Sequence, residues 1–419
     1  MHICVLGAGV IGVTSAYRLL QDGHQVTLVD ALPEAGGGAS FGNGAQLSYS
    51  YVAPLADPTV WTQWPHYLFS TSSPLTLRLQ ADPAQWRWLL KFLAACTSQR
   101  ARRTTVQLLQ LAFFSREQVH ALAATLPFDF SFRTAGKLVM FDAPEMLEGA
   151  RRQVAFQAGL GCRQSVLDAA HCLEIEPALA AGSRRWAGGV YTESEEVGDC
   201  ALFCRGLLGM MQAHPDFHFA HSSTVTALLV QGDRLTSVRT AEQELDADAF
   251  VLALGAGSPA LARQAGFSLP VYPLKGYSIT VPLQDPTPQS APQVSITDLS
   301  RKIVYARLGA RLRVAGRVEL VGRDGSIPPR AIAELTQGVR ELFPAHADWP
   351  ETSALAPWAG FRPATPTGVP IIGRSPLKNL YLNVGHGALG WTLACGSAAL
   401  LADQIAGRPS AIDATPFQA

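Results

Sequence analysis

The sequence has little charge and no excess of either sign. Only 16% of its 419 residues are charged, and 33 basic residues balance 33 acidic ones. This balance argues against a nucleic-acid-binding protein, because such proteins depend on a broad positive field. With 48% hydrophobic residues, the chain can bury a large core, and its length suits two or three connected domains. We therefore expect a globular protein whose partner is a small molecule.

Cysteines are few, and nothing in their spacing indicates disulfides or a metal site. The seven cysteines show no C-x-x-C spacing, which fits buried thiols in a reducing compartment. His214, His218 and His221 form a loose cluster, but Pro215 breaks a helix there. The extended run at 217–221 puts His218 and His221 on opposite faces. We expect no metal.

The sequence also lacks a secretory signal and a convincing membrane span. It starts directly on an apolar strand, without a basic segment or a cleavage site. The run from Tyr381 to Ala402 contains no Lys, Arg, Asp or Glu and is long enough to cross a bilayer. Its glycines and Asn383 instead indicate a buried strand, a Gly-rich turn at 385–390, and a helix from Trp391 to near Gly407. We expect a cytoplasmic protein.

Residues 2–30 form a dinucleotide-binding fingerprint. A strand is followed by a G-x-G-x-x-G turn, an amphipathic helix, a second strand and Asp30, and this context makes the motif specific. Gly7 permits the tight turn, Gly9 leaves room for a pyrophosphate, and Gly12 lets the helix and strand pack closely. Asp30 is expected to bind the ribose hydroxyls and to repel a 2'-phosphate. NADP is therefore disfavoured, while NAD and FAD both remain open.

An insertion after the fingerprint, at 54–103, is rich in aromatic residues. It carries Trp61, Trp64, Tyr67, Phe69, Trp86, Trp88 and Phe92. They suit the core of a helical subdomain, the wall of a substrate pocket, or contact with a membrane interface, and the sequence leaves these three readings open. The candidates for membrane contact are Trp61, Trp64, Trp86 and Trp88.

The remaining patterns predict an α/β fold with an added sheet. The near-continuous apolar run at 249–254 ends in Gly255, as expected of a strand buried on both faces. The segments 271–281, 303–306 and 312–320 alternate well enough to form an antiparallel sheet. Such a sheet is suited to wall one side of an active site.

Four segments together resemble the flavin-dependent amine oxidoreductase superfamily, most closely its bacterial D-amino-acid dehydrogenase small subunits. These segments are the fingerprint Gly7–Gly12 with Asp30, the loop Ser40–Gln46, the strand Val271–Ser278, and the C-terminal pair Gly360–Pro363 and Gly385–Trp391. The resemblance implies FAD. We expect non-covalent FAD, because the loop at 35–50 has neither Cys nor His and Cys395 lies within the last helix.

The resemblance also implies a division of the chain into two domains. We expect a discontinuous Rossmann-like FAD-binding domain at 1–50, 155–265 and 355–419. The substrate domain is expected at 51–154 and 266–354, built on an antiparallel sheet plus helices and including an aromatic-rich helical insertion at about 54–105.

The cofactor-binding residues implied by the resemblance and the fingerprint come from both ends of the chain. They are Gly7, Gly9, Val10, Ile11, Gly12, Asp30, Ala31, Ser40, Asn43, Gly44, Ala45, Gln46, Leu47, Val225, Gly255, Gly360, Gly385, His386, Gly387, Gly390 and Thr392. The Gly385–Gly390 turn precedes a helix whose N-terminus suits negative charge on a reduced flavin. His386 also invites a general-base role, but the resemblance places it in the cofactor turn.

Four residues are candidates for contact with the substrate. Arg362 resembles the family arginine that grips the amino-acid carboxylate, although a structural ion pair is an alternative. Tyr305 resembles a pocket tyrosine. Lys275 and Tyr277 belong to a motif of the dehydrogenase branch, and alternation puts both on one face of a strand. Whether that face meets the flavin or is plain sheet surface stays open.

The resemblance implies oxidative deamination of a D-amino acid. A hydride passes from Cα to flavin N5, and the imino acid hydrolyses to a 2-oxo acid and ammonia. Electrons then pass to a quinone or another acceptor, which implies a peripheral contact with the inner membrane. The alternatives are a glycine, sarcosine or proline-type oxidase that uses oxygen, and an FAD-binding electron-transfer subunit without its own substrate. The oligomeric state stays open.

Overall fold

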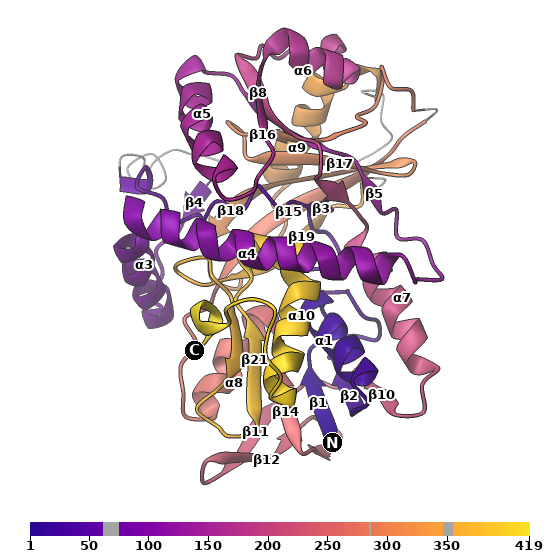
Figure 1. Cartoon of the computed structure of the whole chain (residues 1–419), viewed down its shortest axis with the longest axis vertical. Helices are drawn as coiled ribbons and strands as arrows, with labels where there is room; N and C mark the ends of the chain where they lie inside the picture. The colour runs from indigo at the N-terminus through magenta and orange to yellow at the C-terminus, as the bar shows by residue number, and fades with distance from the viewer. Residues whose placement is uncertain (62–74, 285, 347–354) are drawn as a thin grey trace.

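Two large sheets organise the molecule. The computed structural model describes residues 1–61, 75–284, 286–346 and 355–419. In Figure 1 the sheet that contains β1 and the N-terminus forms the lower half, and the sheet that contains β15 to β18 lies above it. The long helix α4 (Ser98–Ala123) crosses between the two halves.

The lower sheet has six strands, in the order β10-β2-β1-β14-β21-β20. All neighbours are parallel except β20 and β21. Its strands are β1 (His2–Leu6), β2 (Gln25–Val29), β10 (Phe217–Ala220), β14 (Ala249–Leu252), β20 (Ile371–Arg374) and β21 (Leu380–Val384). Both faces are covered, which explains why these strands are almost entirely apolar.

Helices cover one face of this sheet and a small meander covers the other. The helical face holds α1 (Val10–Gln21), α7 (Cys200–Gln212) and α10 (Gly390–Ala406), whose apolar side chains share one core with the sheet. The opposite face holds α8 (Ser258–Gln264) and the antiparallel strands β11 (Ala227–Gln231), β12 (Arg234–Arg239) and β13 (Glu244–Asp246). Helix α10 ends at Gly407 with φ +67°, as the sequence predicted.

The upper sheet has nine strands. Their order is β19-β15-β18-β17-β16-β6-β8-β7, and β4 pairs with β18. The strands are β4 (Leu75–Leu77), β6 (Lys137–Phe141), β7 (Ser165–Asp168), β8 (Gly188–Thr192), β15 (Tyr272–Pro282), β16 (Ser295–Asp298), β17 (Ile303–Leu308), β18 (Arg311–Leu320) and β19 (Trp358–Ala364). The predicted antiparallel pairing of β15, β17 and β18 is confirmed.

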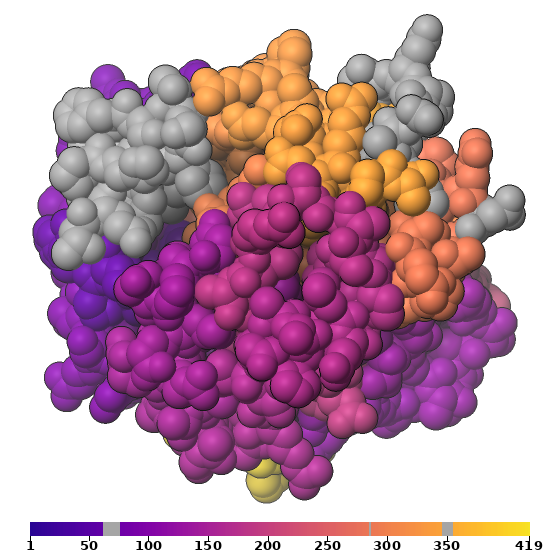
Figure 2. Space-filling view, turned by 90° about the horizontal axis from the view of Figure 1, so that it is seen from above, coloured from indigo at the N-terminus to yellow at the C-terminus, as the bar shows by residue number. Residues whose placement is uncertain are grey.

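Helices pack on one face of the upper sheet and at its edge. The amphipathic helix α9 (Pro329–Leu342) buries Leu335 and Val339 against β15, β17 and β18. Helices α5 (Pro144–Ala158) and α6 (Ala169–Ile175) lie beside β7 and β8. In Figure 2, seen from above, the magenta segment that carries α5 and α6 and the orange segment that carries α9 cover this end of the molecule.

A third sheet joins the two halves. Its strands are β3 (Gln46–Leu47), β9 (Glu196–Val197) and β5 (Arg133–Thr134), in the order β3-β9-β5. Strands β7, β8 and β19 belong to the upper sheet although the sequence assigned 155–265 and 355–419 to the FAD-binding domain. These three strands cross the predicted boundary, and the division into an FAD-binding and a substrate domain stays a prediction.

The aromatic insertion forms a helical subdomain only in part. Trp88 and Phe92 of α3 (Pro83–Ala95) are buried and stacked, with ring centroids 5.1 Å apart. Their core-filling role is confirmed, so Trp88 is not a membrane contact. Trp61 and Trp86 are exposed. Trp64, Tyr67 and Phe69 lie outside the described residues.

Helix α4 extends well beyond the helical insertion that the sequence predicted at about 54–105. It has 26 residues and packs against α10, where the Gly396 N–H donates to the Ser115 hydroxyl at 3.1 Å. A Cβ on Gly396 would lie 2.8 Å from Ser115, so glycine permits the close crossing. The first turns of α4 are rich in arginine and threonine, so this part of the sequence shows no apolar periodicity that would predict a helix.

In the described part of the chain, no helix is both long enough and apolar enough to span a bilayer. All seven cysteines are free and buried, as predicted.

Candidate active site

The turn between β1 and α1 accepts only glycine at two positions. Gly7 has φ +108°, and a Cβ there would lie 2.7 Å from the Ala253 carbonyl oxygen. A Cβ on Gly12 would lie 1.7 Å from the Gly7 carbonyl oxygen. At Gly9 a Cβ would meet only the Ser40 hydroxyl, at 3.6 Å. The turn thus leaves bare backbone beside Gly9, as close approach of a pyrophosphate requires.

Helix α1 presents its N-terminus to the same space. Its first turn holds no acidic residue, and its N-cap Gly9 provides no side-chain cap. The Val10 N–H donates to the Ser40 hydroxyl at 3.0 Å, so Ser40 lies at the helix N-terminus. Free N–H groups and the helix dipole favour an anion there. Val10 and Ser40 therefore lie where the sequence predicted the pyrophosphate.

Asp30 follows β2 and is held by backbone donors. Its carboxylate accepts from the Ala8 N–H at 2.6 Å and from the Leu32 N–H at 2.8 Å. An ionised carboxylate has about four acceptor sites, so capacity remains for ribose hydroxyls. The Ser223 N–H donates to the Asp30 carbonyl at 2.8 Å, which brings the loop that carries Val225 beside Asp30.

The loop Ser40–Ser48, here called the cofactor loop, lies between the two sheets. It starts at the N-terminus of α1, as described above. A Cβ on Gly44 would lie 2.9 Å from Val304 of the upper sheet. At its end, the Ser48 N–H donates to the Thr392 hydroxyl at 3.1 Å, in the first turn of α10. The loop therefore runs from one helix N-terminus to another.

The Gly-rich turn before α10 is fixed by a buried histidine. Gly385 and Gly387 have φ of +85° and +55°, values that favour glycine. His386 is 2% exposed, and its Nε2 lies 2.9 Å from the Ser397 hydroxyl. Burial lowers the pKa of His386 to about 3. The imidazole is therefore neutral and anchors the turn, which argues against a general-base role.

Arg362 lies on the face of the upper sheet that carries Trp358 and the small residues of β15. Its guanidinium covers Gly276, where a Cβ would lie 2.5 Å from Nη2. Its Nη1 donates to the Arg317 carbonyl at 3.0 Å. Arg317 has φ +61° and lies where the pairing of β15 and β18 shifts register. This bulge presents the carbonyl to Arg362.

Arg362 forms no ion pair with a carboxylate among residues 1–61, 75–284, 286–346 and 355–419. Burial lowers the pKa of its guanidinium to about 10, so it remains charged at neutral pH. A half-buried cation with free donors is an anion-binding group, because a planar guanidinium matches a carboxylate.

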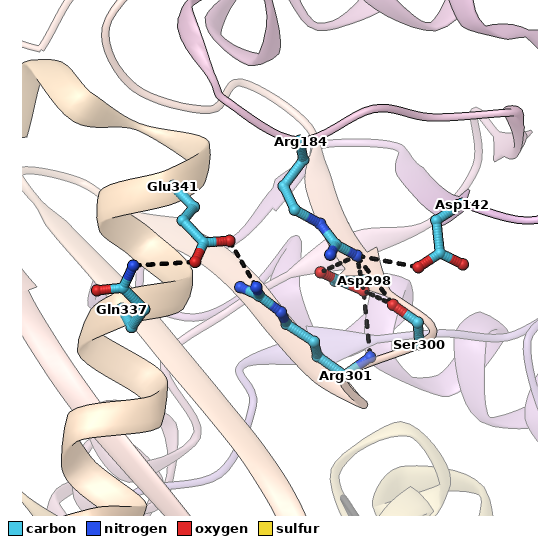
Figure 3. Close-up of polar contacts among 7 residues, drawn as sticks. All are labelled: Asp142, Arg184, Asp298, Ser300, Arg301, Gln337 and Glu341. Carbon is cyan, nitrogen blue, oxygen red and sulfur yellow. Dashed lines mark hydrogen bonds and ion pairs between the residues drawn. The ribbon is translucent and has the colours of Figure 1, made fainter. Parts of the chain in front are cut away.

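Arg184 shows how an arginine with a structural role differs. Its Nη2 donates to Ser300 at 2.9 Å and contacts Asp142 and Asp298 at 3.2 and 3.3 Å (Figure 3). Arg301 in the same cluster pairs with Glu341 of α9 at 2.5 Å. Both cations are neutralised by protein carboxylates, so neither is suited to bind a substrate anion.

The comparison with protein families decides which cofactor this arrangement serves. The family model described as "DAO: FAD dependent oxidoreductase" matches residues 2–404. The chain belongs to this family of FAD-dependent oxidoreductases. The fingerprint alone left NAD and FAD open, and the family match shows that the cofactor is FAD.

Similar proteins agree with this assignment over the full length. "D-amino acid dehydrogenase 2" of Ralstonia nicotianae is 49% identical over 421 residues, which cover 100% of this chain and 99% of that protein. "D-amino acid dehydrogenase 2" of Pseudomonas aeruginosa is 46% identical, with 99% and 97% coverage. Among solved structures, glycine oxidase from Geobacillus kaustophilus aligns with a TM-score of 0.78 at 23% identity, covering 99% of this chain and 97% of that one. This last likeness shows the fold.

The residues described above fit FAD in this oxidoreductase. The bare backbone at Gly9 and the uncapped α1 N-terminus suit its pyrophosphate, and Asp30 suits its ribose. The α10 N-terminus, which has no acidic residue in its first turn, lies at the other end of the cofactor loop. Thr392 accepts from Ser48 and can still donate its own hydroxyl proton.

Trp358 contacts the cofactor loop, which the sequence did not indicate. Its indole covers Gly360, where a Cβ would lie 2.0 Å from the ring, and Gly42 of the cofactor loop, where the distance would be 2.3 Å. Gly360 therefore makes room for the ring, and the indole is the group that faces the loop. A tryptophan two residues before Gly360 in an alternating strand was the available signal.

The predicted shared face of Lys275 and Tyr277 is confirmed, and it is the face opposite Arg362. Leu274 pairs with Arg362, whereas Lys275 pairs with Phe361, so Lys275 points away from Arg362. The Lys275 ammonium lies 5.2 Å from the Tyr277 ring centroid. The Tyr277 hydroxyl donates to Glu319 at 2.6 Å. Both side chains belong to the face that packs on α9.

Tyr305 lies on the same face of the upper sheet as Tyr277. It is fully buried among α9 side chains, with its ring centroid 5.8 Å from that of Phe343. Burial raises the pKa of its hydroxyl well above the ordinary value. Val304, the next residue on β17, faces Gly44, and alternation sends Tyr305 to the opposite side. Tyr305 therefore lies in the core, on the side of the sheet away from Gly44.

The sequence analysis did not identify two buried cations near the cofactor loop, Arg313 and Lys137. Arg313 Nη1 donates to the carbonyls of Phe41 and Asn43 at 3.1 and 3.0 Å. Lys137 donates to Gln46 and Ser48 from β6, as described below. A lysine inside the apolar strand KLVMF was a signal, but its partners are about 90 residues away.

Proposed function

We propose that this chain is an FAD-dependent D-amino-acid dehydrogenase. It oxidises a D-amino acid to an imino acid, which hydrolyses to a 2-oxo acid and ammonia, and it passes the electrons to an acceptor such as a quinone. The observation that carries the proposal is Arg362, a half-buried cation without a carboxylate partner in the described residues. It lies on the sheet face of Trp358, whose indole contacts Gly42 of the cofactor loop. Relatives at 46–49% identity bear the name D-amino acid dehydrogenase.

Arg362 is proposed to bind the substrate carboxylate. Its Nη1 is held by the Arg317 carbonyl, and its guanidinium rests on Gly276, so its position is fixed before substrate arrives. Preorganisation of this kind lowers the entropic cost of binding the substrate in a fixed position. Trp358 lies on the same face and is proposed to limit the space around the substrate side chain.

FAD, when bound, supplies the hydride-accepting centre for the Cα hydrogen of the substrate. The chain's part is to hold the carboxylate so that this hydrogen meets the cofactor. The N-terminus of α10 and the Thr392 hydroxyl favour negative charge at the end of the cofactor loop. His386 keeps the turn in place and holds no mobile proton, because it is neutral and bonded to Ser397.

A membrane contact is the finer part of the proposal and rests on α3. Trp86 and Leu90 are 44% and 66% exposed and lie four residues apart, so they share one face of the helix. Arg87 and Lys91 follow each of them and are exposed. Exposed apolar side chains beside cations suit an anionic lipid surface, where a membrane quinone is found.

The anaerobic visible spectrum of the purified protein tests the proposal. D-alanine and D-proline should bleach the flavin bands, and L-alanine should not. Bleaching by glycine with rapid reoxidation by air would instead support the oxidase alternative. A yellow protein that no amino acid reduces would support an electron-transfer subunit, and a protein that cannot bind FAD would contradict the proposal altogether.

A further inference from the structure

Lys137 is a buried ammonium that contacts the cofactor loop directly. Its side chain is on β6, and the residue is 2% exposed. The Nζ donates to Gln46 Oε1 at 2.6 Å and to Ser48 Oγ at 3.0 Å. Burying an ammonium costs several kcal/mol unless its surroundings compensate. A lysine retained here therefore needs an explanation.

No carboxylate lies within 4.0 Å of the Lys137 ammonium in the part of the chain that the structure describes. The Tyr51 ring lies 4.5 Å from Nζ, a cation–π contact that leaves the charge intact. Glu195 is nearby, but its two oxygens accept from the N–H groups of Tyr49 and Ser50 at 2.6 and 2.7 Å. The positive charge is therefore not cancelled by direct pairing.

The protonation of Lys137 agrees with this geometry. Burial lowers its pKa to about 8, so the ammonium form predominates at neutral pH. Burial also raises the pKa of Glu195, and the charge of Lys137 opposes that rise, so the two groups interact at longer range than an ion pair. On β16, Ser295 pairs with Lys137, and its buried hydroxyl has no partner among the described residues.

The loop that Lys137 contacts links the N-termini of two helices. Ser40 reaches the N-terminus of α1 and Ser48 reaches Thr392 in the first turn of α10. Gln46 and Ser48, the two acceptors of Lys137, belong to the end of the loop at α10. The lysine therefore adds positive charge where a helix dipole already favours negative charge.

We propose that Lys137 is a positioning and electrostatic residue for FAD. It fixes Gln46 and Ser48, and its charge stabilises the reduced cofactor, which gains one negative charge when FAD takes up two electrons and one proton from the amine substrate. The inference rests on the FAD-dependent function proposed above. Loss of the charge should make FAD harder to reduce.

The test compares charge variants of the holoenzyme. Lys137→Met removes the charge at similar length, and Lys137→Arg retains it. A unit charge acting over several Å at an effective dielectric of about 20 changes an equilibrium by roughly tenfold or more. Tenfold in this two-electron couple is about 30 mV. We expect Lys137→Met to lower the midpoint potential of bound FAD by at least that amount and to weaken sulfite binding to the flavin tenfold. For Lys137→Arg we expect the equilibrium constant for flavin reduction and the sulfite affinity to stay within about threefold of the wild-type values.

A second variant keeps the inference testable if Lys137→Met does not fold. Gln46→Glu places a carboxylate against the ammonium with almost no change in shape, and it should lower the potential similarly. The exposed Lys378→Met, 65% exposed in its side chain, serves as control and should leave the potential unchanged. A wild-type potential in Lys137→Met or Gln46→Glu protein with bound FAD would overturn the inference and leave the proposed function standing. A wild-type protein that never binds FAD would instead overturn the function.

Discussion

Gly276→Ala is the substitution that most directly tests the position of Arg362. A Cβ at residue 276 would lie 2.5, 2.7 and 3.0 Å from Nη2, Cζ and Nη1 of Arg362. Ordinary contacts between such atoms exceed about 3.4 Å, so the guanidinium must move by about 1 Å. It cannot move freely, because Nη1 is bonded to the Arg317 carbonyl. The methyl group therefore displaces the proposed carboxylate clamp without removing its charge.

The expected effect follows from that displacement. A misplacement of about 1 Å can cost roughly 100-fold in rate, and complete loss of one partner of a buried charge pair costs about 2–5 kcal/mol. We expect a partial loss of about 1–3 kcal/mol, which is about 5- to 150-fold in kcat/KM. Most of it should appear as a higher KM for D-alanine and as weaker inhibition by a simple carboxylate such as benzoate.

Steady-state kinetics and benzoate titration of the flavin spectrum measure this effect. Gly276 is not one of the glycines with a positive φ in the described chain, so alanine at this position adds no backbone strain. Gly209→Ala in α7 is the matched control, because a Cβ there meets nothing within 4 Å. Unchanged KM and benzoate affinity in Gly276→Ala protein with bound FAD would refute the assignment of Arg362 to the substrate carboxylate.

Three further predictions test other parts of the site. Arg362→Met should lower kcat/KM for D-amino acids by about 30-fold to several-thousand-fold, and Arg362→Lys should recover only part of it, with FAD still bound in both; an unaffected rate would point to another clamp. Trp86→Ser combined with Leu90→Ser should release the protein from anionic vesicles in a sedimentation assay without bleaching the flavin, whereas Leu32→Ser, also an exposed apolar residue, should not. His386 has a pKa lowered from 6.5 to about 3, so the stability from its neutral form is present above pH 6.5 and is lost as the pH falls toward 3. In thermal melts between pH 6 and 4.5, the wild type should lose up to about 1.4 kcal/mol of stability per pH unit more than His386→Gln. Parallel stability curves for the two proteins would contradict this.

The parts of the site that were predicted from sequence depend on local spacing. Gly7, Gly9 and Gly12 perform steric tasks that involve neighbours within one turn, so the motif and its context were sufficient. The predicted strand, turn and helix at 380–406 were confirmed for the same reason. Alternation likewise showed that Lys275 and Tyr277 share a face.

Alternation could not show which face of the sheet meets the cofactor. That choice depends on α9, which covers the face of Lys275, Tyr277 and Tyr305 and leaves the face of Arg362 to the cofactor loop. The contacts of Lys137 were equally hidden, because Gln46 and Ser48 are about 90 residues away in sequence. Long-range packing, and not local propensity, decides both cases.

The two faces of the upper sheet differ in how their cations are partnered, although the chain has no net charge. Arg362, Arg313 and Lys137 lie on one face of the upper sheet, toward the cofactor loop, and bind carbonyl, amide and hydroxyl oxygens there. On the other face, Lys275 and Arg317 have carboxylates within 4.0 Å. Neutral partners leave a cation's field intact, whereas carboxylates cancel it. The cations on the face toward the cofactor loop thus have neutral hydrogen-bond partners, whereas those on the α9 face have carboxylate partners.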